Sequence, residues 1–212
     1  NNYVACMGDT IYRNAFSADG REMRGIFGHM RPNAIRDVKD GTSNTLLLSE
    51  SASNPLGGNR ASYQGRQCNF LHGCYNILGS SIRNNPMICA ATRLPGNTIA
   101  GPYPSSHQRK GWSMHAGFGM MTGFTTVLPP NSPQCAENRG EWVLGIFPPD
   151  SYHPQGVNVG MADGSTRFIR DNINAGWQNC PEPSVLDPCR PDLNQIPGSS
   201  PYGVWGALGT KN

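Results

Sequence analysis

The chain has 212 residues, including 26 Gly and 18 Pro, and carries a formal net charge of +3 with only 15% charged residues. This length allows one sizeable domain, or two small ones, with a real core, and the Gly and Pro content favours turns and irregular segments over long helices. The 17 basic residues form no run or stripe, so nucleic acid is a poor candidate for a partner.

Three segments near the start of the chain have the apolar character of core strands. Residues 2–6 form a short apolar segment that predicts a strand, and residues 25–28 predict a strand or bend packed on the core. The run Leu46–Glu50 begins with three leucines and follows a cluster of turn residues. Such a run predicts a strand that is buried on both faces.

Residues 33–41 have the start and stop signals of a short helix. Asn33 can cap the first amide groups, and Gly41 can adopt the left-handed conformation that ends a helix. Ile35 and Val38 lie three apart and would share one face. We therefore expect a short helix with one apolar face.

The middle of the chain shows little periodicity. Residues 51 to about 111 are dominated by Asn, Gly, Pro, Ser and Arg, which predicts a long excursion from the core, held by disulfides rather than by a large apolar face. Two β-prone runs follow, at residues 123–128 and 141–147, and each ends at a pair of prolines.

A β-hairpin is predicted between residues 156 and 169. Alternating apolar residues at 157–161 meet Asp163-Gly164, a favoured type I′ turn, and a second alternating run follows. If these two residues form the whole loop, Val159 faces Phe168 across the hairpin and one face is apolar.

The C-terminal part begins with a Pro-rich stretch at residues 180–201, which predicts a loop. Residues 202–209 can then form a last helical turn. We expect Val204, Trp205 and Leu208 to pack inward from this turn.

Seven cysteines in a Pro- and Gly-rich chain indicate an oxidising compartment. The alternative hypothesis is a cytosolic metal site, but the sequence has no C-x2-C pair. The spacings of Cys68 from Cys74 and of Cys180 from Cys189 suit local loop crosslinks. The odd count leaves at least one thiol free, intermolecular or paired outside this chain, and spacing does not fix the connectivity. The disulfide candidates are Cys68, Cys74, Cys89, Cys135, Cys180 and Cys189.

Four motif blocks together resemble one bacterial family, the pilin-like proteins with a prepilin-type signal and a processing-associated H-X9-DG domain. The blocks are residues 40–45 with the Leu-rich strand that follows, residues 125–133, His153 with Asp163-Gly164, and residues 205–210. The motif residues are Asp40, Gly41, Ser43, Asn44, Thr45, Glu50, His153, Asp163 and Gly164.

This resemblance implies a β-rich α+β fold, a pilin-like globular head with an antiparallel sheet, short helices and long disulfide-stapled loops. It would be a single domain over residues 1–212, with Cys-rich loop insertions at about 51–111 and 178–200. The resemblance also implies an extracellular or cell-surface protein that assembles with copies of itself, whose precursor carries a long apolar N-terminal helix. Residues 1–30 contain no such helix, so we interpret the chain as a mature or truncated form whose membrane contact would need that helix.

His153 and Asp163 suggest the hypothesis of a shared metal site or an acid/base pair. An extended segment between them would place the two side chains roughly 20 to 30 Å apart, because a strand rises about 3.3 Å per residue. Ligands of one ion lie within about 5 Å of each other. We therefore interpret Asp163 as a turn residue and His153 as a hydrogen-bonding residue at the start of a strand. A calcium site is the less favoured alternative. Calcium needs six to eight oxygen ligands, and the acidic residues near the motif are few: Asp150, Asp163 and Asp171.

The chain has no G-x-S-x-G and no H-E-x-x-H motif, so a hydrolase is the weakest of three hypotheses. The main hypothesis is a non-enzymatic structural or adhesive subunit that self-assembles. The alternative is an extracytoplasmic solute- or carbohydrate-binding module with glycans as partners. Tyr103, Trp112 and Phe124 would form its ligand surface, although burial habits favour a core role for such aromatic residues.

Overall fold

The computed structural model describes residues 2–11, 24–28, 33–52, 63–64, 67–100, 110, 117–140, 142–181 and 199–211. The fold is α+β and strand-rich, with short helices, as predicted. The large sheet has the order β12 (Thr166–Arg170), β11 (Gly156–Met161), β2 (Leu46–Glu50), β1 (Tyr3–Cys6) and β8 (Gly123–Phe124). Its strands pair antiparallel except for β1 with β8, which are parallel.

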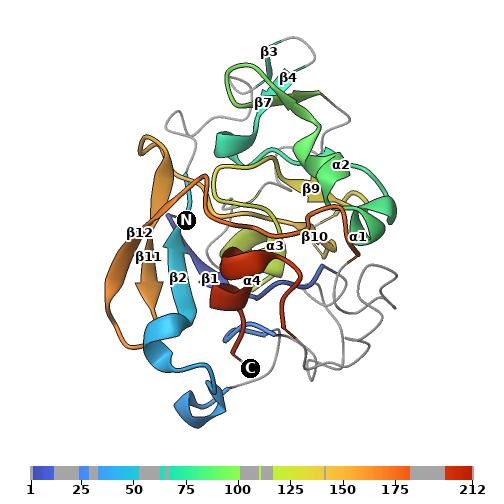
Figure 1. The fold of residues 1–212 in the computed structure, drawn as a ribbon. Helices are drawn as coiled ribbons and strands as arrows, with labels where there is room; N and C mark the ends of the chain where they lie inside the picture. The colour runs from blue at the N-terminus through green and yellow to red at the C-terminus, as the bar shows by residue number, and fades with distance from the viewer. Residues whose placement is uncertain are drawn as a thin grey trace.

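Two smaller sheets lie beside the large one (Figure 1). One has the order β10 (Gly145–Ile146), β9 (Cys135–Ala136) and β5 (Asn76–Ile77), and the other has the order β3 (Tyr63–Gln64), β4 (Gln67–Asn69), β7 (Thr98–Ala100) and β6 (Arg93–Leu94). The helices are short: the 3-10 helices η2 (Ile35–Asp37), η3 (Thr42–Asn44) and η4 (Phe70–His72), and the α-helices α1 (Ser81–Asn84), α2 (Met87–Ala90), α3 (Gly119–Thr122) and α4 (Gly203–Gly209).

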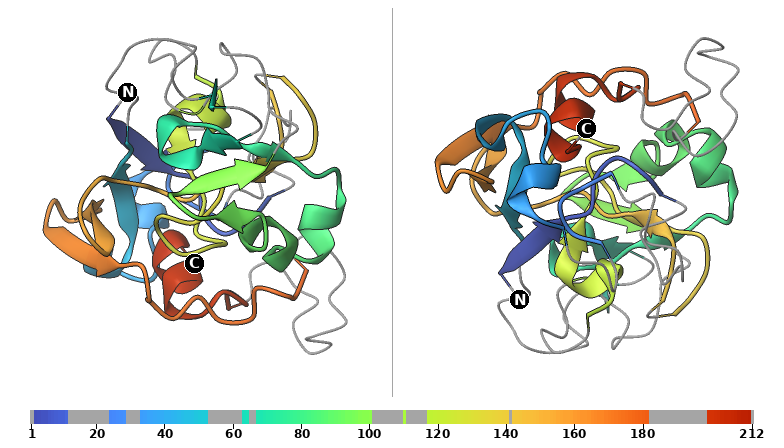
Figure 2. Two further views of the ribbon diagram at one scale, coloured as in Figure 1. Left: turned by 90° about the horizontal axis from the view of Figure 1, so that it is seen from above. Right: turned by 90° about the horizontal axis from the view of Figure 1, so that it is seen from below.

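The main core lies between the inner face of the large sheet and α4, which stay adjacent in all views (Figure 2). The buried members of this core are Val4, Cys6, Leu46, Phe124, Val157, Val159, Met161, Ala175 and Trp205. The indole Nε1 of Trp205 donates to the carbonyl of Leu128 at 2.8 Å, so this large side chain is buried without an unpaired polar atom. In α4, Trp205 and Leu208 pack inward as predicted, but Val204 is 53% exposed.

A β-bulge in β2 fixes which side chains reach the core. Ser49 pairs with Val159, but Leu46 pairs with Met161, so one extra residue of β2 is accommodated there. The bulge puts Leu46 and Ser49, three positions apart, on the same buried face. The expected burial of β2 on both faces is wrong, because Leu48 points to the other face and is 37% exposed.

The predicted hairpin is confirmed, with a different loop. Val159 lies opposite Arg167, and Asn158 lies opposite Phe168. The amide of Gly164 donates to the carbonyl of Met161, and Gly164 has φ 85°. The loop therefore has three residues, a type I turn followed by a left-handed Gly. The extra residue shifts the register by one, so Phe168 lies on the outer face instead of in the core.

In place of the expected helix, residues 33–41 contain one 3-10 turn, η2, and a second, η3, begins directly after Gly41. Asn33 is not the cap, because its amide donates to the carbonyl of Ile26 and its oxygen accepts from Lys211 Nζ. Gly41 does have a positive φ of 89°, where it precedes η3. Ile35 is 76% exposed, so the predicted apolar face does not pack against the core.

Residues 51 to 111 contain more regular structure than the sequence predicted. The described part of this stretch contributes the strands β3 to β7, which pair over short lengths. Conversely, the β-prone runs at 123–128 and 141–147 shrink to the two-residue strands β8 and β10. Strands this short show no sequence period, which explains both errors.

Disulfides hold this region to the core. The predicted Cys68–Cys74 bridge is present, and Cys89 bonds to Cys135 across 46 residues. Closing a loop of that length stabilises the fold by roughly 4 kcal/mol in the chain-entropy view. Cys180 is also disulfide-bonded, while its predicted partner Cys189 lies outside the described residues. Among the described cysteines, Cys6 is free, and burial raises the pKa of its thiol to about 12.

None of the helices in the described part of the chain has the length and apolar character that a membrane span requires.

Candidate functional site

The outer face of the large sheet carries exposed apolar side chains. Tyr3 lies opposite Glu50 in the sheet register, and Asn158 lies opposite Phe168. Glu50 and Asn158 are hydrogen-bonded, so the four side chains form one row across the strands β1, β2, β11 and β12. Leu48 lies in the next row. Tyr3 is 64% exposed and Phe168 is 47% exposed. We call Tyr3, Leu48, Glu50, Asn158 and Phe168 the outer face.

Glu50 organises the polar centre of the outer face. Its Oε2 accepts from the backbone amide of Asn158, and its Oε1 accepts from the Asn158 side-chain amide, both at 2.9 Å. The Nε2 of His153 lies 3.3 Å from Oε1. The His of the motif is therefore placed beside Glu50, while Asp163 lies beyond the far end of β11.

A pocket of about 370 Å³ opens at this end of the sheet. Tyr152, on its wall, is 56% exposed, and partial burial together with the nearby Asp150 charge raises the pKa of its phenol. The lining residues are Asn2, Tyr3, Glu50, Ser51, Ala52, Ser151, Tyr152 and His153. We call this the Glu50–His153 pocket.

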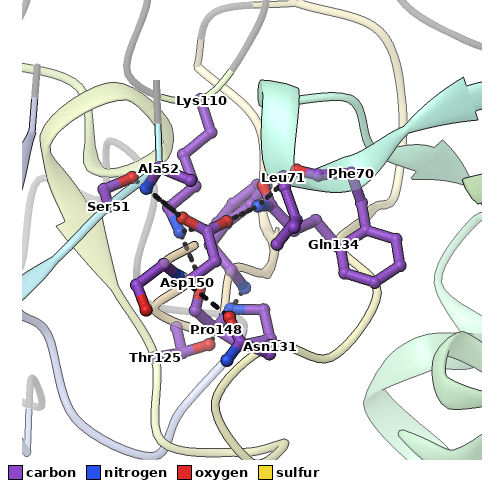
Figure 3. Close-up of polar contacts among 12 residues, drawn as sticks. Ser51, Ala52, Phe70, Leu71, Lys110, Thr125, Asn131, Gln134, Pro148 and Asp150 are labelled. Carbon is purple, nitrogen blue, oxygen red and sulfur yellow. Dashed lines mark hydrogen bonds and ion pairs between the residues drawn. The ribbon is translucent and has the colours of Figure 1, made fainter. Parts of the chain in front are cut away.

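A buried charge network holds one wall of the pocket (Figure 3). Asp150 Oδ1 accepts from the hydroxyl of Ser51 at 3.2 Å and from the amide of Ala52 at 2.8 Å. Its Oδ2 accepts from Gln134 Nε2 at 2.5 Å and lies 3.3 Å from Lys110 Nζ, which also donates to the carbonyl of Pro148. These bonds fix the backbone at residues 51 and 52, where β2 leads into the pocket.

Burial acts on both charges of this network. The side chains of Lys110 and Asp150 are 1% and 2% exposed. Burial raises the pKa of Asp150, although the Lys110 charge and the donated hydrogen bonds oppose that rise. Burial likewise lowers the pKa of Lys110, against the attraction of Asp150. The Asp150 carboxylate is thus stabilised by four hydrogen-bond donors, Lys110 among them, rather than by solvent.

A second wall of the pocket, at residues 151–153, is fixed by Asn131. The Asn131 side-chain oxygen accepts from the amide of Ser151 at 2.9 Å, and its nitrogen donates to Asp171 at 2.8 Å. The Ser151 hydroxyl donates to the carbonyl of Gly156 and accepts from the amide of His153. Asn131 has φ 56°, a conformation that Asn tolerates better than most residues. Both walls are therefore preformed.

The remaining motif residues gather at the other end of β2 and β11. The amides of Ala162 and Asp163 donate to the carbonyls of Thr45 and Thr42, and Arg167 donates to the carbonyl of Ser43. Within the 40–45 segment, Asn44 donates to the carbonyl of Asp40, and Thr45 donates to that of Gly41. This segment thus clamps the hairpin turn.

Asp163 has a local role in that turn. Its Oδ1 accepts from the amide and the hydroxyl of Ser165, at 2.9 and 2.6 Å. The hydrogen bond from the Ser165 hydroxyl is the main cause that lowers the pKa of Asp163. Within the described residues, no three His, Cys, Asp or Glu side chains come together as a metal-binding group, and Asp150, Asp163 and Asp171 have the separate partners given above.

The structure corrects one member of the predicted aromatic ligand surface. Phe124 is fully buried, with its ring 6.3 Å from that of Trp205, so it cannot contact a ligand. Tyr103 and Trp112 lie outside the described residues. The exposed pocket aromatics are Tyr3 and Tyr152, which the sequence reasoning missed. Successive side chains of a strand point to opposite faces of the sheet. The pattern of residues 2–6 could therefore have placed Tyr3 on the other face from the buried Val4 and Cys6.

No curated protein and no solved structure matches the chain. One family model does match, over residues 1–176, which include every strand of the large sheet and all residues of the Glu50–His153 pocket. On this match, the chain belongs to the bacterial family described as "Protein of unknown function (DUF1559)".

Proposed function

We propose that this protein is a non-enzymatic, pilin-like subunit of an extracellular or cell-surface assembly, with a structural or adhesive role. The observation that carries the proposal is the outer face. Tyr3, Leu48 and Phe168 are large apolar side chains that stay exposed on one sheet face. Exposed apolar surface of this kind marks protein interaction sites, and Tyr and Phe are enriched in such interfaces.

Face-to-face contact between copies is the geometry that the sheet favours. The large sheet has two edge strands, β12 and β8. β12 carries Arg167 and Arg170, and β8 consists of two buried residues. Positive side chains on an edge strand discourage the pairing of sheet edges. We therefore propose that copies meet through the outer face and not by extending the sheet.

The disulfides support the proposed location, since such bonds persist in oxidising compartments. The resemblance of the motif blocks to pilin-like proteins supports assembly. The polar groups of the motif also support a structural role. Glu50 ties β2 to β11, and Asp163 closes the hairpin turn. A prepilin-type precursor is part of the same proposal.

Sedimentation velocity on two matched variants tests the assembly surface. Leu48→Arg places a charge at the centre of the outer face, whereas Val204→Arg places the same charge on an exposed apolar position of α4, on the core side of the sheet. We expect wild type and Val204→Arg to form large species and Leu48→Arg to remain monomeric. Equal assembly of all three proteins would rule out the outer face.

A second candidate function, an extracytoplasmic solute-binding module, is favoured by the Glu50–His153 pocket. Its volume lies in the range of about 300 to 1,000 Å³ that small-molecule sites occupy. A binding module would show a rise in melting temperature with its ligand whether or not it polymerises. Thermal-shift measurements on wild type and on Leu48→Arg would separate the two functions.

A further inference from the structure

We propose that the Glu50–His153 pocket binds a neutral sugar, one pyranose unit at the end of a glycan, between Tyr3 and Tyr152. The inference rests on the adhesive or binding role proposed above and names its ligand class. Tyr3 and Glu50 belong to both the pocket and the outer face, whereas Tyr152 belongs to the pocket alone, so Tyr152→Ala tests sugar binding separately from self-assembly.

Exposed aromatic rings favour a sugar site, and two of them line this pocket. Tyr3 and Tyr152 both line the pocket, Tyr3 from β1 and Tyr152 from the segment that leads into β11. Their exposed fractions are 64% and 56%, so these rings are not part of the core. An exposed ring with a polar hydroxyl offers an apolar face for the C–H groups of a pyranose and a donor for its oxygens.

The polar groups of the pocket suit hydroxyls better than a charged ligand. Among the described residues that line the pocket, Glu50 is the carboxylate and there is no Lys or Arg, so an anion would meet the Glu50 charge without a Lys or Arg to bind it. The Glu50 carboxylate is held by Asn158 and lies beside His153. A carboxylate has about four acceptor positions, so it can accept sugar hydroxyls in addition to these bonds.

The walls of the pocket are held by hydrogen bonds within the protein. Asp150 fixes Ser51 and Ala52 on one side, and Asn131 fixes Ser151 on the other. A preformed site loses less conformational entropy on binding, which matters for a weakly hydrophobic ligand such as a sugar. The pocket opens at the end of the sheet, so it can take a terminal unit while the rest of a glycan remains in solvent.

Isothermal titration with the methyl glycosides of glucose, galactose, mannose and N-acetylglucosamine tests this proposal, with choline and sialic acid as charged probes. The variants are Tyr152→Ala, Tyr3→Ala, Tyr3→Phe and Glu50→Gln. Trp177→Ala is the matched control, because Trp177 is 59% exposed and does not line the pocket.

We expect wild type to bind at least one neutral glycoside, and Tyr152→Ala and Tyr3→Ala each to weaken binding about tenfold, which corresponds to the loss of one ring contact. Tyr3→Phe keeps its ring and should retain most of the affinity, Glu50→Gln should lose part of it, and Trp177→Ala should match wild type. The proposal is overturned if no neutral glycoside binds, if only choline or sialic acid binds, or if Trp177→Ala loses as much affinity as Tyr152→Ala. Assembly of Tyr152→Ala, measured in parallel by sedimentation, shows whether the proposed function survives a negative result.

Discussion

Glu50 and Asn158, which lie 108 positions apart, are joined by two hydrogen bonds of 2.9 Å across the neighbouring strands β2 and β11. One of these bonds uses the backbone amide of Asn158, and the other uses its side chain. The contact aligns the two strands at the mouth of the pocket and presents the Glu50 carboxylate beside His153. It therefore links the sheet register to the proposed binding site.

Asn158→Ala should lower the free energy of unfolding by about 1 to 2 kcal/mol, because it removes one hydrogen bond to a charged acceptor and keeps the backbone bond. Asn158→Asp should be worse, since it places a second carboxylate against Glu50. Urea unfolding of the two variants checks the order. A fully stable Asn158→Asp protein would contradict the contact.

Lys110→Met should destabilise the fold by about 3 to 5 kcal/mol at pH 7, because the buried Asp150 carboxylate loses its charged partner. Burial already raises the pKa of Asp150, and the variant should raise it further. A carboxyl group with a raised folded-state pKa contributes stability below its unfolded pKa of about 3.9, and this contribution is lost as the pH rises through the folded pKa.

The Lys110→Met protein should accordingly be most stable near pH 4 and lose stability toward pH 7 in urea unfolding. The double variant Lys110→Met with Asp150→Asn should lose most of this pH dependence, because the carboxyl that lost its charged partner is no longer there to ionise. A single variant as stable as wild type at pH 7 would show that the pair is not coupled.

Two glycines of the hairpin should respond differently to Ala. Gly164 has φ 85°, and a Cβ at this position would stand in open space, so Gly164→Ala should cost only about 1 kcal/mol, from backbone strain. At Gly156 a Cβ would lie 2.3 Å from the carbonyl oxygen of Ile169 and 2.7 Å from the Phe168 ring. Gly156→Ala should therefore disrupt the pairing of β11 with β12 and have the lower melting temperature of the two variants. Thermal unfolding in which Gly164→Ala is the less stable variant would contradict the register of the hairpin.

Cys6 should behave as a protected thiol. It is fully buried, and its pKa is raised to about 12, so little thiolate exists at neutral pH. A maleimide reagent should leave Cys6 unlabelled in the native protein and should label it once the protein is denatured without reductant. Rapid labelling of Cys6 in the native protein would contradict the packing of α4 on β1.

The parts of the fold that follow from local pattern could be predicted from the sequence. The strands at residues 2–6 and 46–50, the hairpin and the Cys68–Cys74 bridge all have signals within a few residues of each other. The hairpin register failed because Asp-Gly suits both a two-residue loop and a three-residue loop that ends in a left-handed Gly. The sequence does not distinguish them, and one residue changes which face Phe168 occupies.

The site itself depends on contacts that have no local signal. Asp150 meets Ser51 and Lys110 from distant parts of the chain, and Glu50 meets His153 only because β2 and β11 are neighbours. The sequence pointed to His153 and Glu50 as motif residues, but not to their pairing. The sequence left Phe124 open as a ligand residue, although burial habits favoured the core position that it occupies, because an aromatic residue among glycines is compatible with both.

Electron microscopy of native material from the cell surface, combined with antibody labelling of this chain, is the decisive test of whether the protein is a subunit of an assembly. We expect ordered polymers in which the labelled chain repeats, and in which the outer face is protected from chemical footprinting at Tyr3. Labelled chains that occur only as dispersed monomers, with Tyr3 fully reactive, would contradict the proposed assembly.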